Sequence, residues 1–407
     1  MKTRTLKPTS PDRTDQHSPS RLSTALLVAG IVLLAANLRP AITSVGPLIG
    51  EIRADIGISN GLIGLLTALP LLAFAALSPL APRLARRWGM EFTLLVSLIV
   101  LVVGIVLRSL PSVVALFAGT ALLGTAIAIS NVLLPSLMKR DFPTRVGLMT
   151  SVYSTIMGSW AALAAGVSVP IAQGLGIGWR GSLACWALLA IVAIVVWLPQ
   201  LRSHHAIAPK RTSTTVRGLW RSLLAWQVTL FMGFQSLVFY AVVTWLSAIL
   251  HDQGMNATSA GWMVSLFQLV GIPSSFLVPM LAGRRPSQRL LVVAIGILCL
   301  TAYAGLLSTG NNLIPLWIAL LGFGQGACIS LALMFFILRT PDAAHAAELS
   351  GMAQSIGYLL AAAGPVLFGL LHDLTHTWTI PLLTLVAVTL GMLCTGLGAG
   401  RNATVTP

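Results

Sequence analysis

Twelve long apolar stretches dominate this sequence, and short segments that carry the charges and turn residues separate them. A helix needs about 20 consecutive apolar residues to cross the hydrocarbon core of a bilayer, and each stretch is close to that length. Only helices or closed barrels satisfy their backbone in lipid, so the pattern predicts an all-α membrane protein with twelve transmembrane helices. The predicted spans are 22–45, 61–82, 90–110, 112–138, 146–173, 180–199, 224–250, 260–282, 289–308, 312–338, 347–371 and 378–399.

Charged residues are scarce in this chain. Hydrophobic residues make up 56% and charged residues 9% of the sequence, against about 25% charged residues in ordinary globular domains. This composition excludes a disordered chain and most soluble enzymes. The four cysteines stand singly within apolar runs and form no Cys-x-x-Cys pair, so neither a zinc site nor a disulfide framework is predicted.

The basic residues are distributed unevenly between the loops. With the N-terminus in the cytoplasm, 21 of the 25 lysines and arginines fall on the cytoplasmic side, and only Arg53, Arg108 and Arg180 fall outside. Positive residues collect in cytoplasmic loops, so this split predicts that both termini are cytoplasmic. It also accounts for the net charge of +15 without a nucleic-acid partner; the predicted partners are the lipid bilayer and a small-molecule substrate.

Similar glycine and proline marks recur in the two halves of the chain. A shift of about 200 residues places Gly61–Pro79 on Gly261–Pro279, and a shift of 198 places Gly124 on Gly322. Such repetition predicts two pseudo-symmetric six-helix bundles, the plan of major facilitator transporters. The predicted organisation is a disordered cytoplasmic tail (1–21), an N-terminal bundle (22–199), a basic cytoplasmic linker (200–223), a C-terminal bundle (224–399) and a cytoplasmic tail (400–407). A monomer is expected.

The segment after the second span, Pro82-Arg83-Leu84-Ala85-Arg86-Arg87-Trp88-Gly89, resembles the major facilitator signature G-x-L-a-D-R-x-G-R. Pro82 stands for the first glycine of the signature and Arg86 for its aspartate. The resemblance implies a loop that takes part in the conformational change, with Arg83, Arg86, Arg87 and Gly89 as its residues. In the superfamily the aspartate caps a neighbouring helix, and Arg86 cannot do so in the same way.

Three further stretches resemble the cyanate/2-nitroimidazole transporter family of that superfamily. They are Asn37-Leu38-Arg39-Pro40, Thr67-Ala68-Leu69-Pro70 and Asn131-Val132-Leu133-Leu134-Pro135. The run from Arg86 to Glu91 favours the 2-nitroimidazole members. The resemblance implies a secondary transporter of small anions or small nitrogen-containing compounds in the bacterial inner membrane. It does not determine the substrate, because one fold carries many different sites.

Arg39 is the one charged residue expected inside a span. It lies about 25 Å from the cytoplasmic end of the first helix at 1.5 Å per residue, which places it in the outer half of the membrane. A guanidinium in hydrocarbon is costly unless it faces a cavity or a partner, so Arg39 is predicted either to contact substrate or to support the outer gate. Pro40 removes a helix hydrogen bond and should bend the span here. Thr43 shares the helix face of Arg39, whereas Asn37 should bond a neighbouring helix.

Amide side chains recur near the middle of other spans, and aromatic residues stand near them. A polar side chain in a span either contacts a ligand or bonds a neighbouring helix, and both interpretations stay open for each amide. As a group they predict a neutral polar cavity with one positive charge, in which an aromatic ring could stack on a flat ligand. The predicted substrate-binding residues are Arg39, Thr43, Asn131, Tyr153, Gln235, Phe239, Gln268, Gln325 and Gln354, with Tyr240 and Tyr358 as neighbouring aromatics.

No acidic residue falls in the middle of a predicted span, and the histidines lie in loops or at span ends. If protons drive transport, only Glu51, Glu348 or Asp373 near the span ends, or the substrate itself, could carry them. The i, i+4 spacing of His372 and His376 is a weak metal signal, and no metal or cofactor is predicted. With no nucleophile–base pair and no nucleotide-binding motif, a membrane-embedded enzyme and an ATP-driven pump are both disfavoured.

Two substrate hypotheses remain within the transporter class. One is export of a heterocycle such as 2-nitroimidazole, with Arg39 on the nitro group. The other is uptake of a small anion such as cyanate, with Arg39 as the counter-charge. Export is preferred on the family resemblance alone. A channel or a sensor forms a further class, which predicts flux without saturation or no flux.

Overall fold

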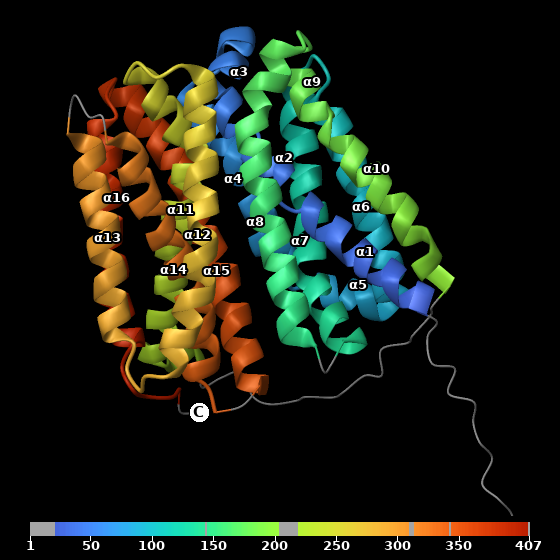
Figure 1. Ribbon diagram of the computed structural model, residues 1–407, viewed down its shortest axis with the longest axis vertical. Helices are drawn as coiled ribbons and strands as arrows, with labels where there is room; N and C mark the ends of the chain where they lie inside the picture. The colour runs from blue at the N-terminus through green and yellow to red at the C-terminus, as the bar shows by residue number, and fades with distance from the viewer. Residues whose placement is uncertain (1–20, 143–144, 203–218, 309–312, 342, 406–407) are drawn as a thin grey trace, which may run out of the picture.

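The structure is a computed structural model, and it describes residues 21–142, 145–202, 219–308, 313–341 and 343–405. Twelve helical segments in this part of the chain are long and apolar enough to cross a membrane, which confirms the predicted fold class. Figure 1 shows the segments as two bundles that stand side by side. Most of the predicted tail and linker (1–20 and 203–218) lies outside the described residues.

The N-terminal bundle is built from the first six spans, several of which are interrupted. Its elements are α1 (Arg21–Asn37), α2 (Pro40–Thr43), the 3-10 turn η1 (Gly46–Leu48), α3 (Ile49–Ile56), α4 (Asn60–Leu77), α5 (Ala81–Trp88), α6 (Met90–Arg108), α7 (Val113–Asp141), α8 (Val146–Val169), the π turn η2 (Pro170–Gly174), α9 (Gly178–Ala184) and α10 (Trp186–Trp197).

The C-terminal bundle has longer uninterrupted helices. After the 3-10 turns η3 (Leu198–Arg202) and η4 (Leu219–Arg221), its elements are α11 (Leu223–Asp252), α12 (Ala257–Gly283), α13 (Arg289–Leu307), α14 (Ile314–Leu338), α15 (Ala343–Thr375) and α16 (Thr379–Ala399).

The spans differ from the predicted limits mainly where a turn residue interrupts or ends a helix. Span one does not stop at residue 45 but continues through η1 and α3 to Ile56. Span two ends at Leu77, and the predicted loop after it forms the separate helix α5. Span six is interrupted at Cys185, between α9 and α10.

Side-chain caps mark the starts of several helices. Ser59, Ser112 and Ser222 accept hydrogen bonds from the backbone N–H three residues later at the starts of α4, α7 and α11, and Asn256 does the same for α12. The first N–H groups of a helix have no partner within it, so these caps satisfy groups that lie near the membrane surface. They set the starts of four spans.

Repeated glycines occupy corresponding contacts in the two bundles. A Cβ at Gly124 on α7 would lie 2.7 Å from Pro70 of α4, and a Cβ at Gly322 on α14 would overlap the backbone of Phe267 on α12. Gly124 therefore lets the fourth span (α7) approach the second (α4), and Gly322 lets the tenth span (α14) approach the eighth (α12) in the same way. This agreement supports the duplication that the glycine pattern predicts.

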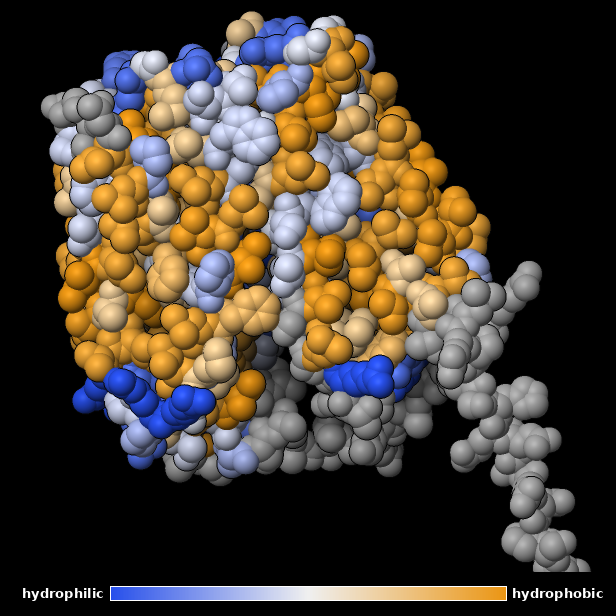
Figure 2. All heavy atoms as spheres, in the orientation of Figure 1, coloured by the Kyte–Doolittle hydropathy of each residue, from blue (hydrophilic) through white to orange (hydrophobic). Residues whose placement is uncertain are grey.

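The outer surface of the two bundles is apolar across its middle. Figure 2 shows an apolar band between polar residues at both ends, as lipid contact requires. Large hydrophobic side chains near the middle of their spans, such as Ile99, Leu188 and Ile297, are exposed there. In Figure 1, α1 begins and the chain ends at the same end of the molecule as α5, in keeping with an even number of spans.

The end of the chain packs against the C-terminal bundle. The Val405 N–H donates to the Arg339 carbonyl at 2.7 Å, and the Gln288 N–H donates to the Gly400 carbonyl at 2.9 Å. Val405 is buried, and the Arg339 guanidinium donates to the Gln288 side chain. The described part of the predicted C-terminal tail is therefore a folded cap on α13 and α14.

Candidate functional site

The first span breaks at the residue that carries its charge. Pro40 has no N–H to donate, and α1 ends at Asn37 before α2 begins at Pro40. The bend predicted from Pro40 is thus present. The Asn37 amide donates to the Leu189 carbonyl of α10 at 3.3 Å, so Asn37 bonds a neighbouring helix as expected.

The break directs Arg39 across the molecule to the other bundle. Its Nη1 donates to the hydroxyl of Tyr240 on α11 at 2.8 Å. The guanidinium carbon lies 5.8 Å from the centre of the Tyr240 ring and 6.0 Å from that of Phe239. Arg39 therefore links the N-terminal and C-terminal bundles near the middle of the molecule, with a hydroxyl and two π faces as its partners.

Aromatic rings from both bundles surround this contact. The Tyr240 ring lies 6.5 Å from the Tyr358 ring, and the Tyr358 ring lies 5.5 Å edge-on from the Phe74 ring of α4. On α8, the Tyr153 hydroxyl donates to the Asn131 side chain at 3.4 Å. We call Arg39, Tyr153, Phe239, Tyr240 and Tyr358 the central cluster. All five are half-buried or buried.

The structure brings only part of the predicted set together. Arg39, Tyr153, Asn131 and Phe239 belong to or touch the central cluster, whereas Thr43 is buried and its hydroxyl donates to the Ala161 carbonyl of α8 at 3.1 Å. Thr43 stays one helical turn from Arg39, because its N–H and its hydroxyl reach the Arg39 carbonyl at 3.0 and 3.2 Å, but its side chain is taken up by the packing between α2 and α8.

The amides are used in different ways. Gln235 donates to its neighbour Ser236 at 2.7 Å, and Gln354 donates to Ser350 at 2.8 Å, both on their own helices. Gln325 is buried inside the C-terminal bundle beside Tyr303. Gln268 is half-buried on α12, and its amide nitrogen has no hydrogen-bond partner among the described residues.

Tyr240 and Tyr358 are the cluster residues that the predicted substrate-binding set did not contain, and Phe74, which packs against Tyr358, was not predicted at all. The chain has only four tyrosines in 407 residues, and three of them lie in the central cluster. That scarcity is the signal in the sequence that could have selected Tyr240 over its neighbour Phe239. The fourth, Tyr303, lies elsewhere in the C-terminal bundle.

A second guanidinium enters the membrane-spanning region. Arg108 was expected on the outer side, but its side chain turns inward and is 1% exposed. Its Nη1 donates to the Ala41 carbonyl at 2.6 Å. That carbonyl lies in the short helix α2, where the broken span leaves backbone groups without helical partners. Arg108 thus supports the segment that carries Arg39, and Arg39 is not the only buried cation.

The signature segment forms helix α5, followed by Gly89 with a φ of 85°. A side chain would strain that backbone, so glycine is required at the turn into α6. Arg83, Arg86 and Arg87 are exposed on α5. With Arg86 in place of the signature aspartate, the acid of this region is Glu91, whose carboxylate binds Arg140 of α7 at 2.6 Å.

The Glu91–Arg140 pair ties two helices of one bundle together. Glu91 is 3% and Arg140 25% exposed at the side chain, and Asp141 also binds Arg140 at 2.6 Å. Burial lowers the pKa of Arg140, but the hydrogen bonds to Asp141 and Glu91 outweigh it and raise the pKa above its ordinary value. The guanidinium therefore stays charged at every physiological pH.

Removing Glu91 should destabilise the protein more than removing an exposed arginine of α5. In Glu91→Ala the half-buried Arg140 keeps only Asp141, and loss of one partner of a buried pair costs up to about 3 kcal/mol here. We expect a melting temperature in detergent several degrees below that of the wild type. Arg86→Ala, which removes an exposed side chain, should melt with the wild type. Equal melting of all three proteins would contradict a structural role for the pair.

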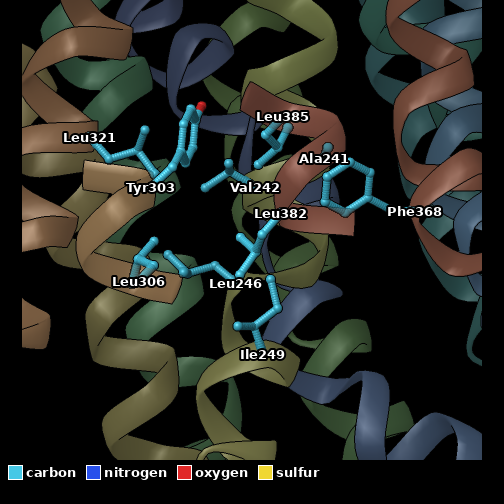
Figure 3. A pocket seen from close by; sticks show the side chains of 10 residues that line it. All are labelled: Ala241, Val242, Leu246, Ile249, Tyr303, Leu306, Leu321, Phe368, Leu382 and Leu385. Carbon is cyan, nitrogen blue, oxygen red and sulfur yellow. The ribbon is translucent and has the colours of Figure 1, made fainter. Parts of the chain in front are cut away.

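An apolar cavity inside the C-terminal bundle is a poor match for a polar ligand. Figure 3 shows it between α11, α13, α14, α15 and α16, lined by leucines such as Leu246, Leu306 and Leu385. Tyr303 contributes its ring, and its hydroxyl points away from the leucines. Among the described residues no group of three His, Cys, Asp or Glu side chains could hold a metal ion.

The two bundles meet at one end of the molecule and separate at the other. In the described residues, the hydrogen bonds between the bundles run from Arg39 toward the end where α3 and α9 lie; Ser247 donates to the Gly46 carbonyl at 2.9 Å and Ser265 to the Ala162 carbonyl at 2.6 Å. At the opposite end, beside α5, Figure 2 shows a hollow between the bundles. The central cluster lies between the closed and the open end.

Comparison with known proteins places this architecture in a family. The family model described as Major Facilitator Superfamily matches residues 25–365. The chain is 49% identical to the uncharacterized transporter YycB of Bacillus subtilis over 92% of this chain and 94% of that protein. It is 44% identical to the 2-nitroimidazole transporter of Escherichia coli over 93% and 96% of the two chains, and 29% identical to the cyanate transport protein of the same species over 86% and 90%.

Solved structures agree with the fold. The nucleoside transporter NupG has a TM-score of 0.73 at 12% identity and covers 92% of this chain and 100% of its own. The D-xylose-proton symporter has a TM-score of 0.71 at 14% identity, with coverage of 94% and 97%. The chain is a multi-pass membrane transporter of small molecules and not an enzyme, and it belongs to the cyanate/2-nitroimidazole transporter family of the major facilitator superfamily.

Proposed function

We propose that this protein exports small flat nitrogen heterocycles of the 2-nitroimidazole type by alternating access, and that the central cluster binds them. The observation that carries the proposal is the Arg39–Tyr240 contact, because it places a cation and aromatic rings between two bundles that must move against each other. The similarity to the 2-nitroimidazole transporter supports the substrate class.

The chemistry of the cluster suits such a ligand. A planar guanidinium offers paired N–H donors that match the two oxygens of a nitro group. Tyr240, Tyr358 and Phe239 offer ring faces and edges to a flat heterocycle. The ligand would replace the Tyr240 hydroxyl as a partner of Arg39, so that binding and the contact between the bundles compete for one guanidinium.

Uptake of a small anion such as cyanate is the second candidate. It is favoured by the fact that Arg39 contacts a hydroxyl and aromatic rings but no carboxylate in the described part of the chain. A cation with no acidic partner attracts an anion into a site of low dielectric. The similarity to the cyanate transport protein supports this alternative.

The direction of the opening follows from the predicted topology. We place both termini and α5 in the cytoplasm, on the distribution of basic residues. The hollow beside α5 then opens to the cytoplasm, and the contacts beside α3 and α9 close the outer face. Export begins from this inward-facing arrangement, in which the central cluster is reached from inside.

Binding assays on purified protein would separate the two candidates. We expect 2-nitroimidazole to raise the melting temperature in detergent and to be carried across proteoliposome membranes with saturating kinetics. Cyanate should give neither effect if the first proposal holds. Saturable cyanate transport with no response to 2-nitroimidazole would establish the second candidate, and non-saturating flux of both would indicate a channel.

A further inference from the structure

The outer ends of α4 and α15 are joined by an aspartate that belongs to one bundle and a helix start that belongs to the other. The Asp373 carboxylate accepts three hydrogen bonds from α4: from the Asn60 amide side chain at 2.7 Å, from the Asn60 backbone N–H at 3.2 Å and from the Gly61 N–H at 2.8 Å. Both of its oxygens are used.

The negative charge of Asp373 strengthens its hydrogen bonds to the start of α4. The first N–H groups of a helix have no intrahelical partner and carry a partial positive charge. A carboxylate that accepts two of these N–H groups and an amide N–H forms charge-assisted bonds, which are stronger than neutral ones. Asp373 thus serves α4 as a cap supplied by the opposite bundle.

The C-terminal bundle holds the capping region in place. His372 Nδ1 lies 3.1 Å from the Asn60 side-chain nitrogen, and the His372 ring stacks on Trp378 with 4.0 Å between centroids. The Trp378 indole N–H donates to Asp252 at 2.6 Å, and Asp252 lies 3.8 Å from His372 Nε2. The cap is therefore a built arrangement on α11, α15 and the start of α16.

Close packing restricts the contact to the closed state. A Cβ at Gly61 would lie 2.7 Å from the Leu370 side chain, and a Cβ at Gly369 would lie 2.6 Å from the Asn60 carbonyl carbon. The two helix ends touch at their backbones, and the bonds to Asp373 cannot survive a separation of a few ångströms. Any outward-facing state must break all of them.

We propose that the Asn60–Asp373 contact is a proton-sensitive latch that holds the outer face closed. The proposal rests on the alternating access described above and goes beyond it by naming a device that sets the balance of the two states. At high pH the carboxylate is charged and the latch is complete. As the pH falls, protonation removes the charge and one acceptor position, so the latch weakens and the outward-facing state gains population.

His372 acts in the same direction. The Asn60 side-chain nitrogen must face the Asp373 carboxylate, because two oxygens would repel, and so it donates its second hydrogen to His372 Nδ1. Protonation of His372 turns that acceptor into a donor and breaks the bond. The other charged or titratable groups that face the latch are Arg53 of α3, Asp252 of α11 and His376 at the end of α15.

The test measures a distance across the outer face, without substrate. Spin labels are placed on Ala54→Cys and Thr377→Cys, exposed positions of opposite bundles, with the four native cysteines replaced by alanine. In the wild-type background we expect a short distance at pH 8, a growing long-distance population toward pH 5 as His372 protonates, and a further rise below about pH 4, where an aspartate carboxyl such as that of Asp373 takes up its proton. Asp373→Asn should raise the ratio of long to short distances at pH 8 at least about tenfold, a change of 1.4 kcal/mol.

Asp55→Asn is the matched control. Asp55 is also an outer acidic residue, but its partners Trp179 and Arg180 lie in its own bundle, so its loss should leave the distances unchanged. A distance distribution that changes neither with pH nor with Asp373→Asn would overturn the proposed latch. Because no substrate is present, a wrong substrate assignment leaves this result intact, and a failed latch leaves the assignment of the central cluster untouched.

Discussion

Arg39→Ala is expected to reduce transport of the true substrate by about two orders of magnitude while leaving membrane insertion intact. A hydrogen bond to a charged group contributes about 1.5–3 kcal/mol, and Arg39 supplies the only cation of the central cluster. Alanine removes the donors that would bind a nitro group or an anion. Initial rates in proteoliposomes, at matched protein density, measure the effect.

Arg39→Lys tests what kind of cation the site needs. Lysine keeps the charge but presents a point charge on a flexible stem instead of a planar fork. Transport of a flat ligand with two oxygens should therefore be lost with lysine as well, whereas cyanate, a linear ion that a point charge can bind end-on, should retain part of its transport. Arg284→Ala removes an exposed arginine far from the cluster and is the control for net charge. Near-normal transport by Arg39→Ala would remove Arg39 from the substrate site.

Gly64→Ala is the second change with a large expected effect. Gly64 of α4 faces Pro365 of α15, and a Cβ there would overlap the Pro365 carbonyl and lie 2.7 Å from the Val366 Cα. These neighbours are backbone atoms that cannot rotate away, so the outer ends of α4 and α15 cannot close. We expect transport to fall at least about tenfold and the outward-facing population to rise, since small residues are what allows helices in membranes to approach closely.

Gly50→Ala is the matched comparison for that change. Gly50 also lies in a helix of the N-terminal bundle, but a Cβ there meets no atom within 4 Å. It should transport as the wild type does, and alanine at a helical position carries no penalty of its own. If Gly64→Ala transports normally and shows the same label distances as Gly50→Ala, closure at α4 and α15 is not required for the transport cycle.

Pairs of distant residues explain why the sequence could predict one member of the site and not its partners. Arg39 stands out because a charge within an apolar run is visible in a window of 20 residues. Tyr240 lies about 200 positions away, and nothing in its own span distinguishes it from Phe239 except the rarity of tyrosine. Both rings lie beside Arg39, and the Tyr240 hydroxyl accepts its hydrogen bond, because of the way α11 is rotated, which packing against neighbouring helices sets.

The orientation of the Arg108 side chain is a second feature that the sequence could not predict. At a span end, a long basic side chain either reaches the headgroups or turns inward, and both are compatible with the sequence. The break at Pro40 decides the outcome, because it exposes the Ala41 carbonyl to a donor on α6. A local signal in one helix thus determines the orientation of a residue in another.

The number of spans, the bend at Pro40 and the position of the cation could be predicted from the amino-acid pattern, because each depends on the cost of placing a charge or a broken helix in lipid, which is local to one segment. The duplicated plan could be predicted from the repeated glycines and prolines. The packing of the helices against one another sets which rings surround Arg39, buries Thr43 against α8 and Gln325 inside the C-terminal bundle, and brings Asp373 to the start of α4. These features arise where two bundles touch, and the contact energy belongs to residues that are neighbours in space but lie hundreds of positions apart in the chain.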